Sequence, residues 1–448
     1  MLFSSTTFIF YFLPLVLILY YTVFLKLPKV RNVLLLLFSL LFYAWGEPKF
    51  VLVMICSIVA NYIFALIIAR NQSKIWLVVM LIYNFALLFV FKYLTYTMTL
   101  LGLDIINITL PIGISFFTFQ AVSYVIDVYR KDTPVQKNLM DLGLYISFFP
   151  QLIAGPIVRY TDFVSQINNR RSTREKFSDG IIRFCIGLGK KVIIANNMAL
   201  IADKAFGADA TITVAFAWIG AIAYMFQIYF DFSGYSDMAI GLAKMFGFDL
   251  LENFNYPYVS SSITEFWRRW HISLSTWFRD YVYIPLGGSR VSSKNRFYFN
   301  LFIVWLLTGI WHGANLTFLV WGLYYFVLLA IEKVIDKQFV KINVALRHLS
   351  TLLLVLVGWV IFRADSLTAA TEYLKIMFGG AAFANKNVIF YLNEYKFFFV
   401  VGFLASTPIF KDKKWFNTIS YFIAPIILIV SISYIIKGAY NPFIYFNF

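Results

Sequence analysis

Apolar segments long enough to cross a bilayer recur along most of the chain. A membrane-spanning helix needs about 20 predominantly apolar residues, and about 13 runs approach that length. They lie near 8–25, 32–45, 50–69, 75–99, 107–127, 140–158, 180–202, 212–230, 297–312, 314–334, 349–363, 387–408 and 417–437. This pattern predicts an all-α polytopic membrane protein whose spans pack into a helical bundle.

Proline and glycine interrupt two of these runs, at 111–113 and at 155–156. Irregular backbone at membrane depth is tolerated only where it is buried in protein or lines a cavity. We therefore expect about 10 to 12 true spans, together with re-entrant and interfacial helices. The pattern shows neither an internal repeat nor a linker, so residues 1–448 are predicted to form a single integral membrane domain.

The composition supports this assignment and argues against two other classes of protein. Hydrophobic residues make up 61% of the chain and charged residues only 13%, whereas a soluble domain is about a quarter charged. The net charge of +16 would suit a nucleic-acid-binding protein if it formed a basic face on a folded domain. Here the basic residues lie in short loops between apolar runs, so nucleic-acid binding is not expected.

Loop charges predict the orientation of the chain. Cytoplasmic loops carry an excess of Lys and Arg. In this chain the first and third loops are basic, the second is balanced, and the loop before the last run is basic again. The first loop contains Lys26, Lys29 and Arg31, and the third contains Arg70 and Lys74. The second contains Glu47 and Lys49, and the loop before the last run contains Lys411, Lys413 and Lys414. Both termini are therefore expected on the outer side.

The stretch from 264 to 281 carries unusual side chains between apolar runs. Read as one helix, it has an apolar face with a spacing of three and four residues. Trp270 and His271 lie on that face, and Arg268 lies on the opposite, charged one. An amphipathic helix at the membrane interface has the same pattern, but this interpretation leaves an imidazole among tryptophans unexplained.

A second histidine, His312, lies between two long apolar runs and is flanked by Gly309 and Gly313. Ionisable residues at membrane depth are costly and are functional candidates by default, and the glycines would let a substrate approach the backbone. A neutral imidazole hydrogen-bonded inside the bundle is the structural alternative. His271 and His312, with no thiol nearby, are too few for a zinc site, so no metal is expected.

A third polar group lies at the end of an apolar run. Its candidate functional residues are Asp231, Ser233, Tyr235 and Asp237. Polar side chains at the end of a span can line a substrate path. They can equally stop one helix and cap the next, with Ser236 or Asp237 as the N-cap. The glycine-rich segment 187–191 lacks the spacing of a phosphate-binding loop, and we interpret Lys190 and Lys191 as interface charges.

Five motifs, taken in order, are familiar. They are FPQLIAGP (149–156), DFSGYSDMAIG (231–241), ENFNYPY (252–258), FWRRWHISLSTWFRDYVYIPLGG (266–288) and WHG (311–313). On these motifs the chain resembles the membrane-bound O-acyltransferase family, and within it the bacterial alginate and peptidoglycan O-acetyltransferases. The resemblance covers a core of about 1–365, whereas the C-terminal spans at about 387–437 match only as hydrophobic segments.

The resemblance implies a helical bundle with a thin core, an outer funnel and a cytoplasmic tunnel, placed in a bacterial cytoplasmic (inner) membrane. It implies transfer of an acetyl group from acetyl-CoA to a hydroxyl of an exported polysaccharide, without a permanently bound cofactor. It also implies a partner with an exported or periplasmic SGNH-type acetyltransferase domain.

The resemblance further implies roles for individual residues. His312 matches the catalytic histidine of the family, and a neutral imidazole is suited to take a hydroxyl proton as general base. His271 matches a second motif histidine, which we expect to orient the donor or donate to the oxyanion. The other candidates for the substrate path or the oxyanion are Trp311, Asn315, Trp270, Arg268, Asp231, Ser233, Tyr235 and Asp237.

Other functions stay open on the sequence alone. A D-alanyl or lipid O-acyltransferase of the same superfamily would use a different donor or acceptor. A transporter or flippase would explain the spans and the buried polar groups, but it predicts an internal pseudo-symmetry that the sequence does not show. A scaffold subunit would only bind partners. Acyl transfer by the purified protein would separate an enzyme from the last two.

Overall fold

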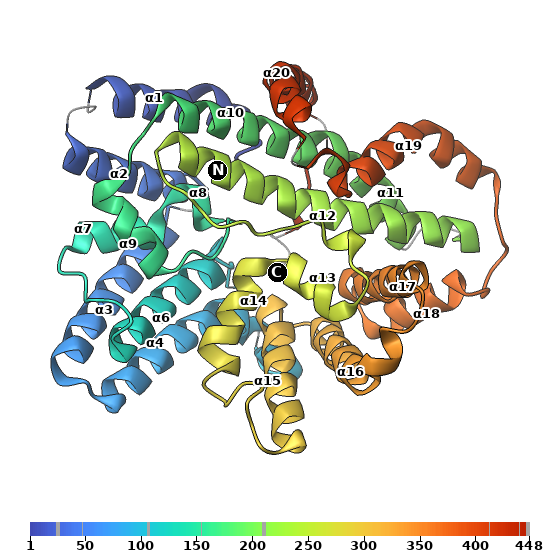
Figure 1. The fold of residues 1–448 in the computed structure, drawn as a ribbon, viewed down its shortest axis with the longest axis horizontal. Helices are drawn as coiled ribbons and strands as arrows, with labels where there is room; N and C mark the ends of the chain where they lie inside the picture. The colour runs from blue at the N-terminus through green and yellow to red at the C-terminus, as the bar shows by residue number, and fades with distance from the viewer. Residues whose placement is uncertain are drawn as a thin grey trace. The chain divides into compact units, whose positions relative to one another are not determined.

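The computed structural model describes residues 1–23, 27–46, 48–104, 108–153, 155–207, 212–411, 413–438 and 440–444. Throughout these ranges the regular structure is helical (Figure 1). Lys26 and Glu47, which contribute to the predicted orientation, and Ala154 of the FPQLIAGP motif lie outside the described residues. The all-α architecture predicted from the apolar runs is confirmed.

Nine helices in the described part of the chain are long and apolar enough to span a membrane. They are Lys29–Gly46, Phe50–Asn71, Lys74–Lys92, Arg174–Phe206, Val214–Met245, Leu316–Ile335, Val344–Arg363, Val388–Ala405 and Thr418–Ile436. Phe8–Val23 is a further, shorter apolar helical segment. The chain is therefore a multi-pass membrane protein.

The described residues fall into two compact units, which we call unit 1 (1–185 and 235–251) and unit 2 (186–234 and 252–448). Unit 1 contains η1 (Phe8–Phe12), α1 (Leu13–Ile18), η2 (Leu19–Val23), α2 (Pro28–Gly46), α3 (Phe50–Asn71), α4 (Lys74–Lys92), α5 (Leu94–Leu100), α6 (Ile114–Arg130), α7 (Leu139–Ser147), α8 (Phe149–Leu152), α9 (Tyr160–Asn169), most of α10 (Arg174–Gly189) and the end of α12 (Val214–Met245).

Unit 2 contains the rest of α12 and both histidines of interest. Its other helices are η3 (Lys190–Ala195), α11 (Asn196–Phe206), η4 (Pro257–Val259), α13 (Ile263–Arg269), α14 (Ile272–Phe278), η5 (Arg279–Tyr283), α15 (Lys294–His312), α16 (Leu316–Phe339), α17 (Val344–Arg363), α18 (Leu367–Met377), α19 (Lys386–Ala405), η6 (Pro408–Phe410) and α20 (Lys414–Ile436).

Phenylalanine rings fill part of the core of unit 1. Phe8 lies against Phe3, Phe12 and Phe42, with ring centroids 5.0, 5.5 and 5.9 Å away. The pairs are tilted, stacked and edge-on, respectively, and offset stacking and edge-on contact are the favoured arrangements of aromatic rings. Aromatic side chains therefore pack the helices of unit 1 together.

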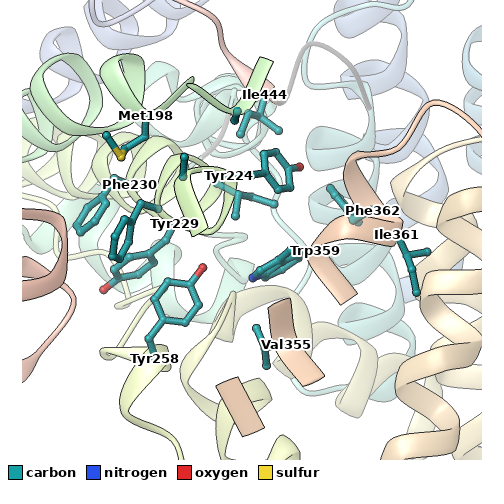
Figure 2. Packing of buried hydrophobic residues seen from close by; sticks show 14 of the residues in the cluster. Met198, Tyr224, Tyr229, Phe230, Tyr258, Val355, Trp359, Ile361, Phe362 and Ile444 are labelled. Atoms are coloured by element: carbon teal, nitrogen blue, oxygen red, sulfur yellow. The ribbon is translucent and has the colours of Figure 1, made fainter. Parts of the chain in front are cut away.

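An aromatic cluster joins α12, η4, α13 and α17 in unit 2 (Figure 2). Tyr229 packs against Phe230 and Tyr258, with ring centroids 4.8 and 5.1 Å apart. Trp359 of α17 is 1% exposed, and its ring lies 4.8 Å from that of Trp270. The cluster therefore fixes the end of α13 between α12 and α17, next to His271.

The continuity of α12 contradicts one prediction. This helix runs without interruption from Val214 to Met245, so 231–237 neither ends a helix nor caps the next one. Apolar residues continue beyond the polar group, and both carboxylates in it form ion pairs, Asp231 with Lys191 and Asp237 with Arg183. Because the charges are paired, the helix can continue through them.

The single amphipathic helix predicted at 264–281 is also wrong. Helix α13 ends at Arg269, a new helix, α14, begins at Ile272, and the π-helical turn η5 follows it directly. His271 interrupts the helix because its backbone is left-handed, with φ 43° and ψ 56°. A periodicity of apolar residues carries no information on such a short break, which covers only Trp270 and His271.

Candidate active site

His271 lies at a left-handed break that a neighbouring loop holds by its backbone. The Asn255 N–H donates to the Arg269 carbonyl at 2.9 Å, and the Ile272 N–H donates to the Asn253 carbonyl at 2.9 Å. These two bonds flank His271 on either side. A non-glycine residue pays energy for this conformation, and such strain is concentrated at functional sites. The surrounding backbone is what makes the strained position stable.

The imidazole of His271 is buried and has one polar anchor. Its Nδ1 lies 3.1 Å from Asn253 Oδ1, which also accepts from Ser273 N and Oγ at 3.2 and 2.9 Å. Phe232 of α12 meets the ring edge-on at 4.6 Å. Within the described residues, Nε2 has no hydrogen-bond partner. Burial lowers the pKa of His271 to about 3, so the ring is neutral at physiological pH.

His312 is the last residue of α15 and lies among aromatic rings. Its ring centroid is 5.0 Å from that of Trp321 and 5.1 Å from that of Phe362, both nearly perpendicular to it. The side chain is buried, and Gly313 follows in an extended conformation that takes the chain out of the helix. The position therefore combines an apolar enclosure with an abrupt end of the helix.

Glycines bring α15 and α16 into direct backbone contact just before His312. A Cβ on Gly309 would lie 2.6 Å from the carbonyl oxygen of Phe318, and one on Gly322 would lie 2.5 Å from that of Trp305. Only glycine fits such an approach. The close approach at Gly309 is therefore made by a neighbouring helix of the same chain, whereas the approach of a substrate to this backbone stays a prediction.

One tryptophan relates the two histidines in space. The Trp311 ring lies 4.9 Å from the His312 ring and 6.2 Å from the His271 ring. The three residues come from the end of α15 and from the break between α13 and α14. Although 271 and 312 are far apart in sequence, unit 2 therefore places both imidazoles beside the same tryptophan ring.

Two further candidates from the same motif lie in different surroundings. Trp270 is buried against Phe266, Phe254 and Trp359, with centroids 5.6, 5.1 and 4.8 Å away. Arg268, two residues earlier, is exposed. The structure therefore places Trp270 in the packing beneath the break, whereas it does not bring the Arg268 side chain to the histidines.

Asn315 has a local structural role at the start of α16. Its Oδ1 accepts from the Thr317 N–H at 3.1 Å, and its Nδ2 donates to the Asp365 carbonyl at 2.9 Å. The first bond caps the helix, and the second joins it to the chain after α17. The structure thus shows these polar atoms engaged in holding the loop after His312.

The polar residues of α12 that lie in unit 2 form a buried charged cluster. Asp231 Oδ1 lies 2.6 Å from Lys191 Nζ, and both side chains are 1% exposed. Lys191 is therefore not an interface charge, as the sequence suggested, but the buried partner of Asp231. Asp231 Oδ2 also accepts from the Ile444 N–H at 2.9 Å, and Ser233, two residues later on α12, is buried as well.

The remaining residues of this group lie in unit 1. Tyr235 stacks on Phe3 at 4.6 Å and accepts from its N–H at 3.4 Å. Asp237 accepts from Arg183 at 2.6 Å. Both side chains are thus engaged in holding the core of unit 1.

Asn253, the anchor of His271, is a residue that we did not single out from the sequence. It lies in the ENFNYPY motif at 252–258, which carried the resemblance but no chemical argument. Its 18-residue separation from His271 hides the contact from any local pattern. The available signal was an amide side chain within an aromatic-rich motif. Such a side chain is too common to indicate a functional site by itself.

Comparison with known proteins gives consistent results. The model of the membrane-bound O-acyltransferase family matches residues 133–369, a range that includes Asn253, His271 and His312. The chain is 47% identical to a probable alginate O-acetylase of Pseudomonas syringae pv. tomato, over 84% of this chain and 75% of that protein. It is 34% identical to the peptidoglycan O-acetyltransferase of Helicobacter pylori, over 100% of this chain and 98% of that protein.

A more distant similarity covers about half of the chain. The teichoic acid D-alanyltransferase of Bacillus subtilis is 33% identical over 52% of this chain and 61% of its own length. All three relatives are described as enzymes that transfer an acyl group. The shared chemistry, rather than a shared acceptor, is what the comparisons have in common.

Proposed function

The chain belongs to the membrane-bound O-acyltransferase family, and from this premise we propose that it moves an acetyl group from cytoplasmic acetyl-CoA to a hydroxyl of an exported polysaccharide. O-Acyltransferase activity follows from the family and from the relatives. The acetyl group and the polysaccharide acceptor are taken from the alginate and peptidoglycan relatives. The observation that carries the site is the pair of buried imidazoles joined through Trp311.

The proposed reaction needs one proton acceptor and one place for negative charge. The hydroxyl oxygen attacks the thioester carbonyl carbon, a C–O bond forms, and the C–S bond breaks. In our proposal His312 takes the hydroxyl proton and returns it to the thiolate of the departing coenzyme A. The apolar rings around His312 exclude water, which would otherwise compete with the hydroxyl for the acetyl group.

The location and partners of the reaction belong to the same proposal. Acetyl-CoA is made in the cytoplasm, whereas alginate and peptidoglycan lie outside the cytoplasmic membrane. A multi-pass protein in that membrane can receive the donor on one side and deliver the acetyl group on the other. Transfer is either direct or passes through an exported SGNH-type acetyltransferase partner.

A purified-protein assay tests the proposed chemistry. The full chain in detergent is given acetyl-CoA with mannuronate oligosaccharides or with peptidoglycan fragments, and free thiol and acetyl ester are measured. We expect thiol release that depends on the protein and on His312, with ester formed on one of the two acceptors. Consumption of a D-alanyl thioester, with acetyl-CoA left intact, would instead support a D-alanyltransferase. Absence of covalent transfer from either donor would contradict the proposal.

A further inference from the structure

We propose that Asn253 is a positioning residue that holds His271 in one tautomer, with Nδ1 protonated and Nε2 left as a hydrogen-bond acceptor. The role in catalysis rests on the proposed function, whereas the tautomer is a property of the folded chain alone. Four observations on residues 253–273 carry the inference. Each concerns the direction of a hydrogen bond or the burial of an atom.

The orientation of the Asn253 amide is fixed by a backbone group. An amide oxygen and nitrogen are distinguished only through the bonds they make. The atom that faces Ser273 lies 3.2 Å from the backbone nitrogen of that residue. A backbone N–H can only donate, so the facing atom of Asn253 is its oxygen. The Ser273 hydroxyl, 2.9 Å from the same atom, agrees with this direction.

The orientation of the amide determines the proton on His271. Asn253 Oδ1 lies 3.1 Å from His271 Nδ1, and a carbonyl oxygen has only lone pairs to offer. The imidazole must therefore donate from Nδ1. A neutral imidazole carries one proton, so Nε2 has a lone pair and no hydrogen. Asn253 is 1% exposed and His271 2% exposed, so water does not compete for either position.

The Nε2 atom of His271 is the ring nitrogen that is available to a ligand. Within the described residues, His271 Nε2 is buried and has no partner, and a buried polar atom without a partner is costly. The cost would be removed by a ligand that donates a hydrogen bond, such as the hydroxyl of the acceptor. The oxyanion-donor role considered for His271 does not fit, because a neutral ring in this tautomer has no Nε2 proton to donate.

The surroundings keep the ring neutral. The side chains next to the imidazole include Asn253 of the loop, Phe232 of α12 and Trp311 of α15, and Ser273 of α14 donates to the same Asn253 oxygen. None of these four carries a charge, and burial is the cause that lowers the pKa of His271. An Asp at position 253 would favour the charged imidazolium. The neutral amide of Asn253 instead sets the tautomer and leaves the ring uncharged.

The two main-chain hydrogen bonds on either side of His271 make the inference testable. The loop holds the break through main-chain bonds of residues 253 and 255, and these bonds survive a change of the Asn253 side chain. Asn255 provides a matched control, because its Oδ1 accepts from Lys411 Nζ at 3.1 Å, away from the imidazole. The two asparagines thus share a loop and a residue type, but only one contacts His271.

Nitrogen NMR on the full chain reads the tautomer directly. The chain has only three histidines, so 15N-histidine labelling with a His271→Gln spectrum for assignment is sufficient. We expect Nδ1 protonated and Nε2 unprotonated in the wild type and in Asn255→Ala, and a mixture or the reverse tautomer in Asn253→Ala. A protonated Nε2 in the wild type, or an unchanged tautomer in Asn253→Ala, would overturn the proposal.

Acetyl transfer from acetyl-CoA gives the second readout. Asn253→Ala should lower kcat by about tenfold or more, as the loss of an orienting partner does elsewhere, and Asn255→Ala should stay near wild type. Equal losses in both variants would show a structural role for the loop and overturn the assignment. If the wild type does not use acetyl-CoA, the proposed function fails, but the NMR result still decides the tautomer.

Asn253→Asp keeps the inference testable if the alanine variant does not accumulate. Three donors point at Oδ1, so a carboxylate at this position keeps Nδ1 protonated. Its charge favours the imidazolium, raises the pKa of His271 and moves the acid limb of the rate profile to higher pH. An unchanged titration of His271 in Asn253→Asp would count against the contact.

Discussion

At the scale of single residues, the two histidines of the site are held in different ways. His271 has a polar anchor and a strained backbone, whereas His312 is held by the aromatic rings of Trp311, Trp321 and Phe362. The first arrangement specifies a proton position, and the second specifies an apolar enclosure. The first arrangement suits His271 as an acceptor that points in one direction, and the second suits His312 as a base shielded from water.

Replacement of His312 tests the base assignment. His312→Ala should lower the rate of acetyl transfer by about 10²–10⁴-fold, because a positioned proton acceptor contributes about that much. His348→Ala is the control, since His348 lies on α17 with its Nδ1 3.1 Å from the Ser260 carbonyl oxygen. Rates are compared at equal amounts of purified protein. A His312→Ala rate within about tenfold of wild type would remove His312 as the base.

At the scale of elements, the contact between α15 and α16 places His312. Gly309 and Gly322 let the two helices meet at backbone distance, and His312 follows three residues after Gly309 on the same helix. A small shift of α15 would therefore move the imidazole and Trp311 together relative to His271. The position of His312, the proposed base, depends on this helix pair as much as on its immediate neighbours.

Gly309→Ala should separate the two helices. The added methyl would lie 2.6 Å from the Phe318 carbonyl oxygen, whereas a Cβ on Gly46 would meet nothing closer than 3.5 Å. We expect Gly309→Ala to cost about 1–3 kcal/mol, as overpacking does, and to lower activity as well. Gly46→Ala should be neutral. Thermal midpoints from fluorescence-detected gel filtration measure the cost, and equal midpoints for the two variants would contradict this account of the crossing.

The ion pair between η3 and α12 makes a separate prediction. Removing one charge from a buried pair leaves the other uncompensated, which costs about 3–5 kcal/mol. Asp231→Asn and Lys191→Met should each lower the thermal midpoint strongly. The double variant should be more stable than the sum of the two losses implies, because neither charge is then left alone. Strictly additive losses would show that Lys191 and Asp231, though 2.6 Å apart, do not interact energetically.

The elements also show where sequence interpretation succeeded and where it did not. Length and apolar content predicted the spans, because both are properties of a continuous segment. The break at His271 and the continuity of α12 were missed, because each depends on a distant partner. For His271 that partner is the loop at 253–255, and for Asp231 it is Lys191. The motif resemblance found both histidines, but only the folded chain shows Asn253 beside one of them.

At the scale of the whole molecule, the proposed function requires a defined orientation in the membrane. Loop charges place the start of α4 in the cytoplasm and the turn before α3 outside. The cytoplasmic side must hold the donor, because acetyl-CoA is found there. Orientation is therefore part of the mechanism, and an inverted chain would present its donor side to a compartment without acetyl-CoA.

Cysteine labelling tests the orientation. Cys185 is buried and Cys56 is exposed on α3, and both are removed first. Lys49→Cys, beside Glu47 and within the described residues, should react with an impermeant reagent on intact cells. Ser73→Cys, at the start of α4, should react only after the membrane is opened. The opposite pattern would invert the chain and exclude export of a cytoplasmic acetyl group.

The O-acetyl content of the exported polysaccharides is the most direct test of the central claim. A deletion strain is complemented with the wild type, His312→Ala or His348→Ala at matched membrane levels, and acetyl esters on secreted polysaccharide and on peptidoglycan are quantified. The account predicts that the deletion removes the esters from one polymer, that the wild type and His348→Ala restore them, and that His312→Ala does not. Unchanged esters after deletion, or full restoration by His312→Ala, would contradict it.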